Sequence, residues 1–108
     1  MSVTNDITDG IGSITFSSAK KNSLPAAVLT QLAEAVTAMG NDPAAKVVVL
    51  RSAGDGPFCA GASFDELLLI DQPERGNEFF RGFARVILAL KKCPKFVIAR
   101  VQGPAIGG

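Results

Sequence analysis

Two glycine-rich turns follow apolar runs of the sequence, and at these turns the backbone itself could carry chemistry. Ala60-Gly61-Ala62 comes after the apolar run at 47–50, and Gly103 to Gly108 follows the largely apolar stretch at 96–101. An apolar run without alternation, such as that at 47–50, is typical of a strand covered on both faces, and α/β sheets bind ligands at the carboxyl ends of their strands. Two such turns on neighbouring strands can direct their N–H groups at one point. The pair would form an oxyanion hole, which stabilises charge on a carbonyl oxygen in acyl or enolate chemistry.

An oxyanion hole of backbone donors needs small side chains around it, so that a thioester or ester can approach. The small residues of the two turns meet this requirement: Ala60, Gly61, Ala62, Gly107 and Gly108. The alternative is that the glycines serve only positive φ angles or close packing.

Side-chain chemistry is restricted by what the chain lacks. It contains no His, Trp or Tyr, so it cannot form a Ser-His-Asp or Cys-His mechanism by itself, or a His-ligated metal site. Cys59 and Cys93 are too far apart in sequence to indicate a disulfide framework or a zinc site, and we interpret each as a small buried apolar residue. We predict no metal site. Carboxylates, lysines and backbone dipoles remain.

A capping-box pattern follows the first turn. Ser63 precedes Glu66 by three residues, ahead of the apolar run at 67–70. In such a box the serine oxygen accepts from a first-turn N–H and the glutamate reaches back to the cap. We therefore predict a short helix over about 63–70, interpret Glu66 as part of the cap, and interpret Asp65 as first-turn helix charge.

Length and composition indicate one small domain with a core. The chain has 108 residues, of which 47% are hydrophobic and 19% charged, and its net charge is +1. This balance gives little support for a nucleic-acid or acidic-membrane partner. No uncharged apolar stretch approaches the ~18 residues of a membrane span, and the first residues lack a signal pattern. We predict a cytoplasmic protein.

The elements that must position the turns alternate between strand and helix. A hairpin is expected between 2–9 and 11–17, turning at Asp9-Gly10, with an apolar face of Ile7, Ile11, Ile14 and Phe16. A helix is expected from Pro25 to Gly40-Asn41. A second helix is expected over about 74–92. One of its faces is apolar and would serve the core, an acyl-chain pocket or a subunit contact: Phe79, Phe80, Phe83, Val86, Ile87 and Leu90.

This order of strands and helices predicts an α/β fold with a mostly parallel sheet. The glycine-rich turn at 103–108 suggests that residues 1–108 are the front part of a longer domain.

The ordered motifs resemble the crotonase (enoyl-CoA hydratase/isomerase) superfamily. They are 58–64, Phe-Cys-Ala-Gly-Ala-Ser-Phe, followed by Gly103 to Gly108, with Asn22-Ser23-Leu24 upstream. The resemblance covers essentially the whole chain, as the N-terminal part of the family's catalytic domain. It implies a superhelix of ββα repeats, incomplete at its C-terminal end, and a homotrimer or a dimer of trimers. It also implies an acyl-CoA thioester substrate and no separate cofactor, because coenzyme A is part of that substrate.

The residue-by-residue match implies a binding site. The N–H groups of Ala62 and Gly108 would hold the thioester oxygen. Ala60, Ala62, Ser63 and Phe64 would border the pantetheine and thioester, and Lys20, Asn22, Ser23 and Leu24 would lie near the adenine. The chain departs from the family at Ser63, where many members have Asp, and at Pro25, where many have a Ser or Thr cap. The family's two acid/base glutamates lie beyond the double glycine, so residues 1–108 alone should not form a complete active site.

Three functions are in competition. The first is hydration of a 2-enoyl-CoA, or double-bond isomerisation, in fatty acid metabolism. The second is a non-catalytic homologue that binds CoA thioesters. The third is a P-loop nucleotide-binding protein, because Gly103 to Gly108 spells Gly-x-x-x-x-Gly after an apolar strand. A P-loop needs Lys and then Ser or Thr as the next two residues. This interpretation also leaves the turn at 60–62 unexplained. Lys20 and Lys21 would be solvated at the surface or would attract a ligand phosphate.

Overall fold

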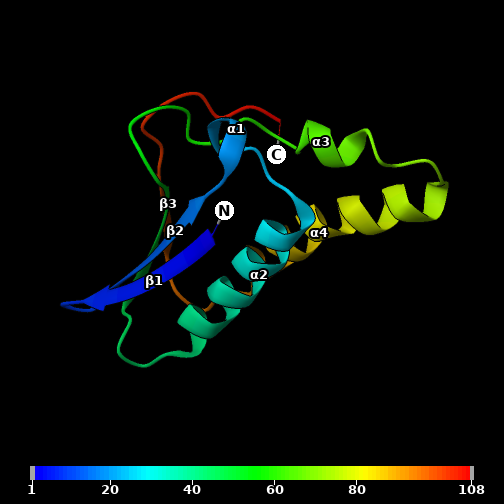
Figure 1. The fold of residues 1–108 in the computed structure, drawn as a ribbon. Helices are drawn as coiled ribbons and strands as arrows, with labels where there is room; N and C mark the ends of the chain where they lie inside the picture. The colour runs from blue at the N-terminus through cyan, green and yellow to red at the C-terminus, as the bar shows by residue number, and fades with distance from the viewer. Residues whose placement is uncertain (1, 108) are drawn as a thin grey trace.

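The computed structural model describes residues 2–107. Its elements, in chain order, are β1 (Ser2–Thr8), β2 (Ile11–Ser17), α1 (Ala19–Asn22), α2 (Ala26–Asn41), β3 (Val47–Ser52), α3 (Phe64–Leu67), α4 (Pro73–Lys92) and β4 (Val97–Arg100). The strands form one sheet in the order β1-β2-β3-β4, with β1 antiparallel to β2 and both other pairs parallel. The helices α2 and α4 lie next to each other on one side of this sheet (Figure 1). The predicted α/β class with a mostly parallel sheet is confirmed.

A hairpin opens the chain, as predicted. Asp9 and Gly10 have φ angles of 52° and 81°, the two positive values that a type I′ hairpin turn requires. The predicted apolar face is correct for Ile14 and Phe16, which are 0% and 2% exposed, but wrong for Ile11, which is 46% exposed. Side chains alternate along a strand, so Ile11 projects from the face opposite to the one that Ile14 and Phe16 share.

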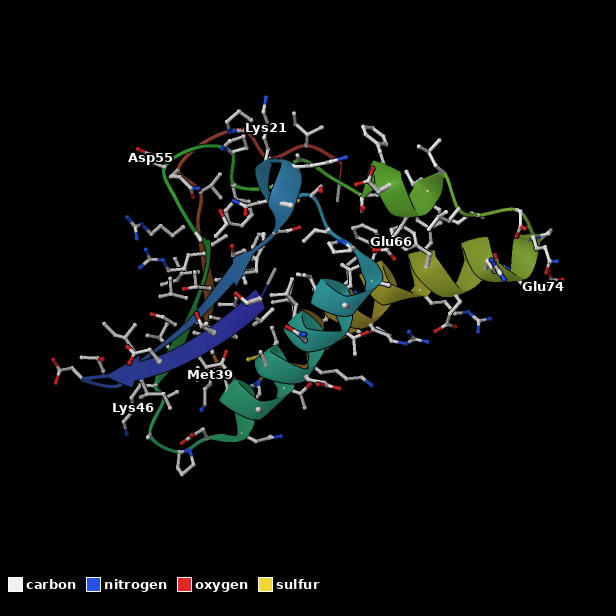
Figure 2. All side chains as sticks on the ribbon, viewed as in Figure 1. Lys21, Met39, Lys46, Asp55, Glu66 and Glu74 are labelled. Atoms are coloured by element: carbon white, nitrogen blue, oxygen red, sulfur yellow. The ribbon has the colours of Figure 1, made fainter. Side chains whose placement is uncertain are left out.

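The core lies between the sheet and α2. Its fully buried side chains are Ile14, Val28, Leu29, Val36 and Val48. Gly12 belongs to the same face of β2, and a Cβ there would lie 2.5 Å from Met39 Sδ. Figure 2 shows Met39 extending from α2 toward the sheet. The glycine thus leaves the space that the methionine side chain fills.

The long helix α4 approaches α2 closely at Gly82. A Cβ on Gly82 would lie 3.0 Å from Leu29 Cδ1, which gives a packing reason for a residue that otherwise weakens a helix. Phe79 is buried, but Phe80 and Ile87 are 53% and 55% exposed. The face expected to serve the core, an acyl-chain pocket or a subunit contact is therefore buried only in part, because the contact with α2 covers only part of it.

Three other expectations need adjustment. The run at 47–50 was expected to be covered on both faces, but Val48 alone of its four residues is fully buried; Val47 and Val49, which point away from α2, are half-buried. The helix expected over 63–70 is a single turn, Phe64–Leu67. Pro25 is the N-cap of α2 rather than its first residue, whereas Pro73 is the first residue of α4.

A second, smaller set of pairings builds repeats. After each of β2, β3 and β4, the chain forms a short extended segment near residues 24, 59–62 and 105, and these segments are joined by parallel bridges between Leu24 and Ala62 and between Cys59 and Ala105. A helix follows each of the first two segments. The predicted ββα repeats are confirmed. None of the helices within residues 2–107 combines the length and apolar character needed to cross a bilayer.

The Gly12–Met39 contact gives a stability prediction. Gly12→Val should lower the free energy of unfolding by about 1–3 kcal/mol, because the added methyl groups overlap Met39 in a packed core. Urea unfolding measures the change. Gly56→Ala is the matched control, since a Cβ there meets nothing within 4 Å. Equal stability of Gly12→Val and wild type would contradict the packing argument.

Candidate active site

The Ala60-Gly61-Ala62 turn is fastened to the segment around Leu24. The Leu24 N–H donates to the Gly61 carbonyl oxygen at 2.7 Å, and the Ser63 N–H donates to the Leu24 carbonyl oxygen at 3.1 Å. These bonds lie on either side of Ala62 in the sequence. In a parallel bridge, the residue between two bonded neighbours directs its own N–H away from the partner strand. The Ala62 N–H therefore points away from Leu24.

The other edge of the same segment pairs with the second glycine-rich turn. The Cys59 N–H donates to the Pro104 carbonyl oxygen at 3.2 Å, and the Ile106 N–H donates to the Cys59 carbonyl oxygen at 2.9 Å. The stretch at 104–106 is thus extended, and its backbone groups are bonded to a neighbouring segment. A P-loop instead curls its N–H groups around a phosphate. The P-loop interpretation is therefore contradicted.

The two turns approach each other most closely at their glycines. Gly61 has a φ of 92°, and a Cβ on it would lie 3.0 Å from the Ile106 carbonyl oxygen. Gly107 has a φ of 69°, and a Cβ on it would lie 3.5 Å from Gly61 Cα. The two turns lie side by side in Figure 1, where the red C-terminal segment runs along the green loop. The prediction that the two turns lie on neighbouring strands and come together is confirmed.

The donors of the expected oxyanion hole are only partly described. Ala62 is half-buried, and among the bonds within residues 2–107 none is made by its N–H. Gly108, the expected second donor, lies outside the described residues. The paired hole thus stays a prediction.

The serine cap is present, but the capping box is only half formed. Ser63 Oγ accepts from the Glu66 N–H at 3.4 Å, as predicted. The Glu66 carboxylate does not reach back to Ser63; its two oxygens accept from the Ala26 N–H at 2.9 and 3.2 Å. The reason is that the Ser63 N–H is already bonded to Leu24. Phe64, expected to border the ligand, is 74% exposed.

Two of the residues expected near the adenine, Lys20 and Asn22, lie in a left-handed turn together with Lys21. The φ angles of residues 20, 21 and 22 are 55°, 63° and 61°. Asn22 is 8% exposed, and its side-chain amide is hydrogen-bonded to backbone groups of the protein. Its nitrogen donates to the carbonyl oxygens of Ala53 and Pro57 at 3.1 and 3.0 Å, and its oxygen accepts from the Ser18 N–H at 3.1 Å. The Asn22 side chain therefore braces the loop after β3.

The remaining residues of this group differ in exposure. Lys20 Nζ lies 2.8 Å from Asp65 Oδ2, with both side chains about two-thirds exposed, so the pair contributes at most about 1 kcal/mol. Ser23 Oγ donates to the Ala19 carbonyl oxygen at 3.3 Å. Leu24 is buried in the core. The structure thus brings Leu24, Ala60, Ala62 and Ser63 together, and links Lys20 to the same corner through Asp65.

Sequence reasoning missed one feature of this region and left a second one open. Gln102 Nε2 donates to Ser52 Oγ at 3.0 Å and to the Gly56 carbonyl oxygen at 3.1 Å, a brace that no sequence signal indicated. An apolar cavity of about 240 Å³ lies between the sheet, α2, α4 and the segments at 58–59 and 105–107. Part of its lining, Phe83, Val86, Ile87 and Leu90, belongs to the α4 face for which an acyl pocket was one alternative.

The approach of the two glycines gives a second prediction. Gly61→Ala should destabilise the protein by about 1–3 kcal/mol more than Gly54→Ala, because both positions have a positive φ but only Gly61 lies against another backbone. Gly54 has a φ of 82° and open space around it. Gly54→Ala is therefore the control, because it introduces the same kind of backbone strain as Gly61→Ala without a close contact. Urea unfolding of both variants measures the difference. Equal losses would show that the turns tolerate separation.

This geometry recurs in known proteins. The Enoyl-CoA hydratase/isomerase family model matches residues 6–108. Methylglutaconyl-CoA hydratase of Rattus norvegicus is 35% identical over 88 residues, which are 82% of this chain and 28% of the relative. A hexahydro-indene-carboxyl-CoA hydrolase of Rhodococcus jostii is 33% identical over 100 residues, which are 93% of this chain and 38% of the relative.

The fold agrees with these matches. The crystal structure of an enoyl-CoA hydratase/carnithine racemase from Magnetospirillum magneticum superposes with a TM-score of 0.89 at 25% identity, covering 97% of this chain and 40% of that one. The chain therefore spans well under half the length of these relatives. Motifs, repeats and family model agree: the chain belongs to the enoyl-CoA hydratase/isomerase family, the crotonase superfamily, and corresponds to the N-terminal part of its domain.

Proposed function

We propose that the full-length protein acts on an acyl-CoA thioester as a 2-enoyl-CoA hydratase or isomerase. The observation that carries this proposal is the contact between the Gly61 and Gly107 turns beside an Ala62 N–H that has no acceptor among residues 2–107. The Ala62 N–H and the Gly108 N–H would together hold the thioester oxygen. Family membership supports the same substrate class, because the hydratase and hydrolase relatives are both named for CoA esters.

The proposed role of the two N–H groups follows from where charge develops. When water adds to C3 of a 2-enoyl thioester, the electrons of the double bond move onto the thioester oxygen and form an enolate. Isomerisation passes through an enolate too, after a proton leaves the carbon skeleton. Fixed donors stabilise that charge without reorganising, and loss of one donor typically raises the barrier by about 2.7–4 kcal/mol.

We assign proton transfer to residues outside 2–107. Of the two carboxylates that follow the turn, Asp65 is paired with Lys20 and Glu66 is bonded to the Ala26 N–H. A general acid or base must lie within hydrogen-bond reach of the proton it moves. Because both carboxylates already bind other groups of the protein, we propose neither as the general acid or base.

The rest of the substrate would lie along the same corner of the molecule. We propose that Ala60, Ser63 and Phe64 border the pantetheine and thioester, because the first two flank Ala62 and the exposed Phe64 ring is open to a ligand. Lys20, Ser23 and Leu24 would lie toward the adenine, and Asn22 would act through the loop that it braces. We also propose that the protein forms a homotrimer or a dimer of trimers, which analytical ultracentrifugation would test. Its cytoplasmic location stays a prediction.

The experiment is turnover of short and branched 2-enoyl-CoA thioesters by the full-length protein, followed by the absorbance of the conjugated double bond. Replacing the Ala62 amide with an ester by semisynthesis removes one donor and should lower kcat by about 10²–10³-fold. The same replacement at Glu34, an exposed residue in the middle of α2, controls for the chemistry of the substitution.

Three other outcomes would contradict the proposal in different ways. Saturable CoA-thioester binding without turnover would favour the non-catalytic alternative. Release of free thiol without loss of the double bond would indicate a hydrolase. Neither binding nor turnover would remove CoA thioesters from consideration.

A further inference from the structure

We infer that Glu66 is a positioning residue that keeps the Ala62 N–H aimed at the substrate by tying α3 to the first turn of α2. Figure 2 shows Glu66 between α3 and the beginning of α2. This inference rests on the proposed function, since it concerns the donor that the function uses. It assigns Glu66 no part in proton transfer.

The Glu66 carboxylate caps a backbone N–H at the start of α2 that has no partner within the helix. The first N–H groups of a helix have no partner within the helix and are usually capped by a side chain. The N-cap of α2 is Pro25, which makes no side-chain hydrogen bond. Glu66 supplies the missing acceptor from another element, and its two oxygens receive the Ala26 N–H at 2.9 and 3.2 Å. A negative charge is also favoured at this end of a helix.

The same contact continues a series of bonds that surrounds Ala62. The chain from Leu24 to Ala26 is joined to the chain from Gly61 to Glu66 at three successive points. The first two are the bonds of Leu24 with Gly61 and Ser63, and the third is the bond from Ala26 to Glu66. Ala62 lies between the first two points, and the third prevents α3 from rotating about them.

Within residues 2–107, the other side-chain bond from α3 to another element is the ion pair between Lys20 and Asp65. The Lys20–Asp65 pair is about two-thirds exposed at both side chains, so solvent screens it. Glu66 is half-buried and bonds to a backbone group at a helix terminus. A small displacement of an aligned catalytic group is costly; 1 Å can change a rate by about 10²-fold. Loss of this tie should therefore reduce kcat.

The experiment separates positioning from simple helix capping. In the full-length protein, Glu66→Met keeps the length of the side chain and removes both acceptors. We expect kcat to fall about tenfold or more, with KM nearly unchanged and a lower Tm. Glu66→Gln keeps one acceptor oxygen and should be intermediate. Glu34→Met, on the exposed face of α2, is the matched control and should retain wild-type kcat.

A second substitution gives the decisive comparison. Pro25→Ser restores a side-chain cap to α2 without tying α3. In the Glu66→Met background it should recover Tm but not kcat. Recovery of both would show that Glu66 merely caps α2 and would overturn the inference.

Amide hydrogen exchange at Ala26 tests the Glu66 contact independently of the proposed function, because the measurement needs no substrate. Glu66→Met should speed exchange at Ala26 at least tenfold, and Pro25→Ser should not reverse this, since a serine cap bonds to later N–H groups. Unchanged exchange would show that the contact does not hold in solution. If the wild-type protein turned over no enoyl-CoA while Glu66→Met did speed exchange, the proposed function would fail and the contact alone would stand.

Discussion

The pairing of three short extended segments positions both glycine-rich turns and therefore the candidate site. The segment at 59–63 is bonded on one edge to Leu24 and on the other to the stretch at 104–106. Each pairing is a single bridge, so its position is set by the few backbone bonds around it. Those bonds favour a glycine at 61, since the φ there is 92° and a Cβ would lie 3.0 Å from the Ile106 carbonyl oxygen.

The larger elements hold these segments in register. β2, β3 and β4 bring the start of each segment to the same edge of the sheet, and α2 fixes the sheet from one face through contacts such as Met39 against Gly12. The left-handed turn at 20–22 then directs the chain into the first segment. Left-handed backbone costs about 1–2 kcal/mol for each residue with a side chain. The three hydrogen bonds of the Asn22 side chain help to offset that cost.

The proposed pair of backbone donors would explain why one family supports several reactions. A main-chain N–H recognises an oxygen and is indifferent to the acyl group attached to it. The hydratase and the hydrolase relatives match this chain at 35% and 33% identity, so the shared part of the fold does not specify the reaction. In this view the residues around the acyl chain and the proton-transferring groups determine specificity, which agrees with the general separation of fold and function.

The fold class, the order of the main elements and the family could be predicted from the sequence, because they depend on local patterns: the Asp9-Gly10 turn, the Pro25 and Gly40-Asn41 signals that bound α2, and the spacing of the glycines. Tertiary structure alone decided which partner each polar group takes. Glu66 looked like half of a capping box, yet it binds Ala26, forty residues away in sequence. Ile11 looked like a core residue and is exposed, because burial depends on what packs against a face and not on the face alone. Local sequence fixes backbone preference, whereas hydrogen-bond partners and burial are set by segments that only folding brings together.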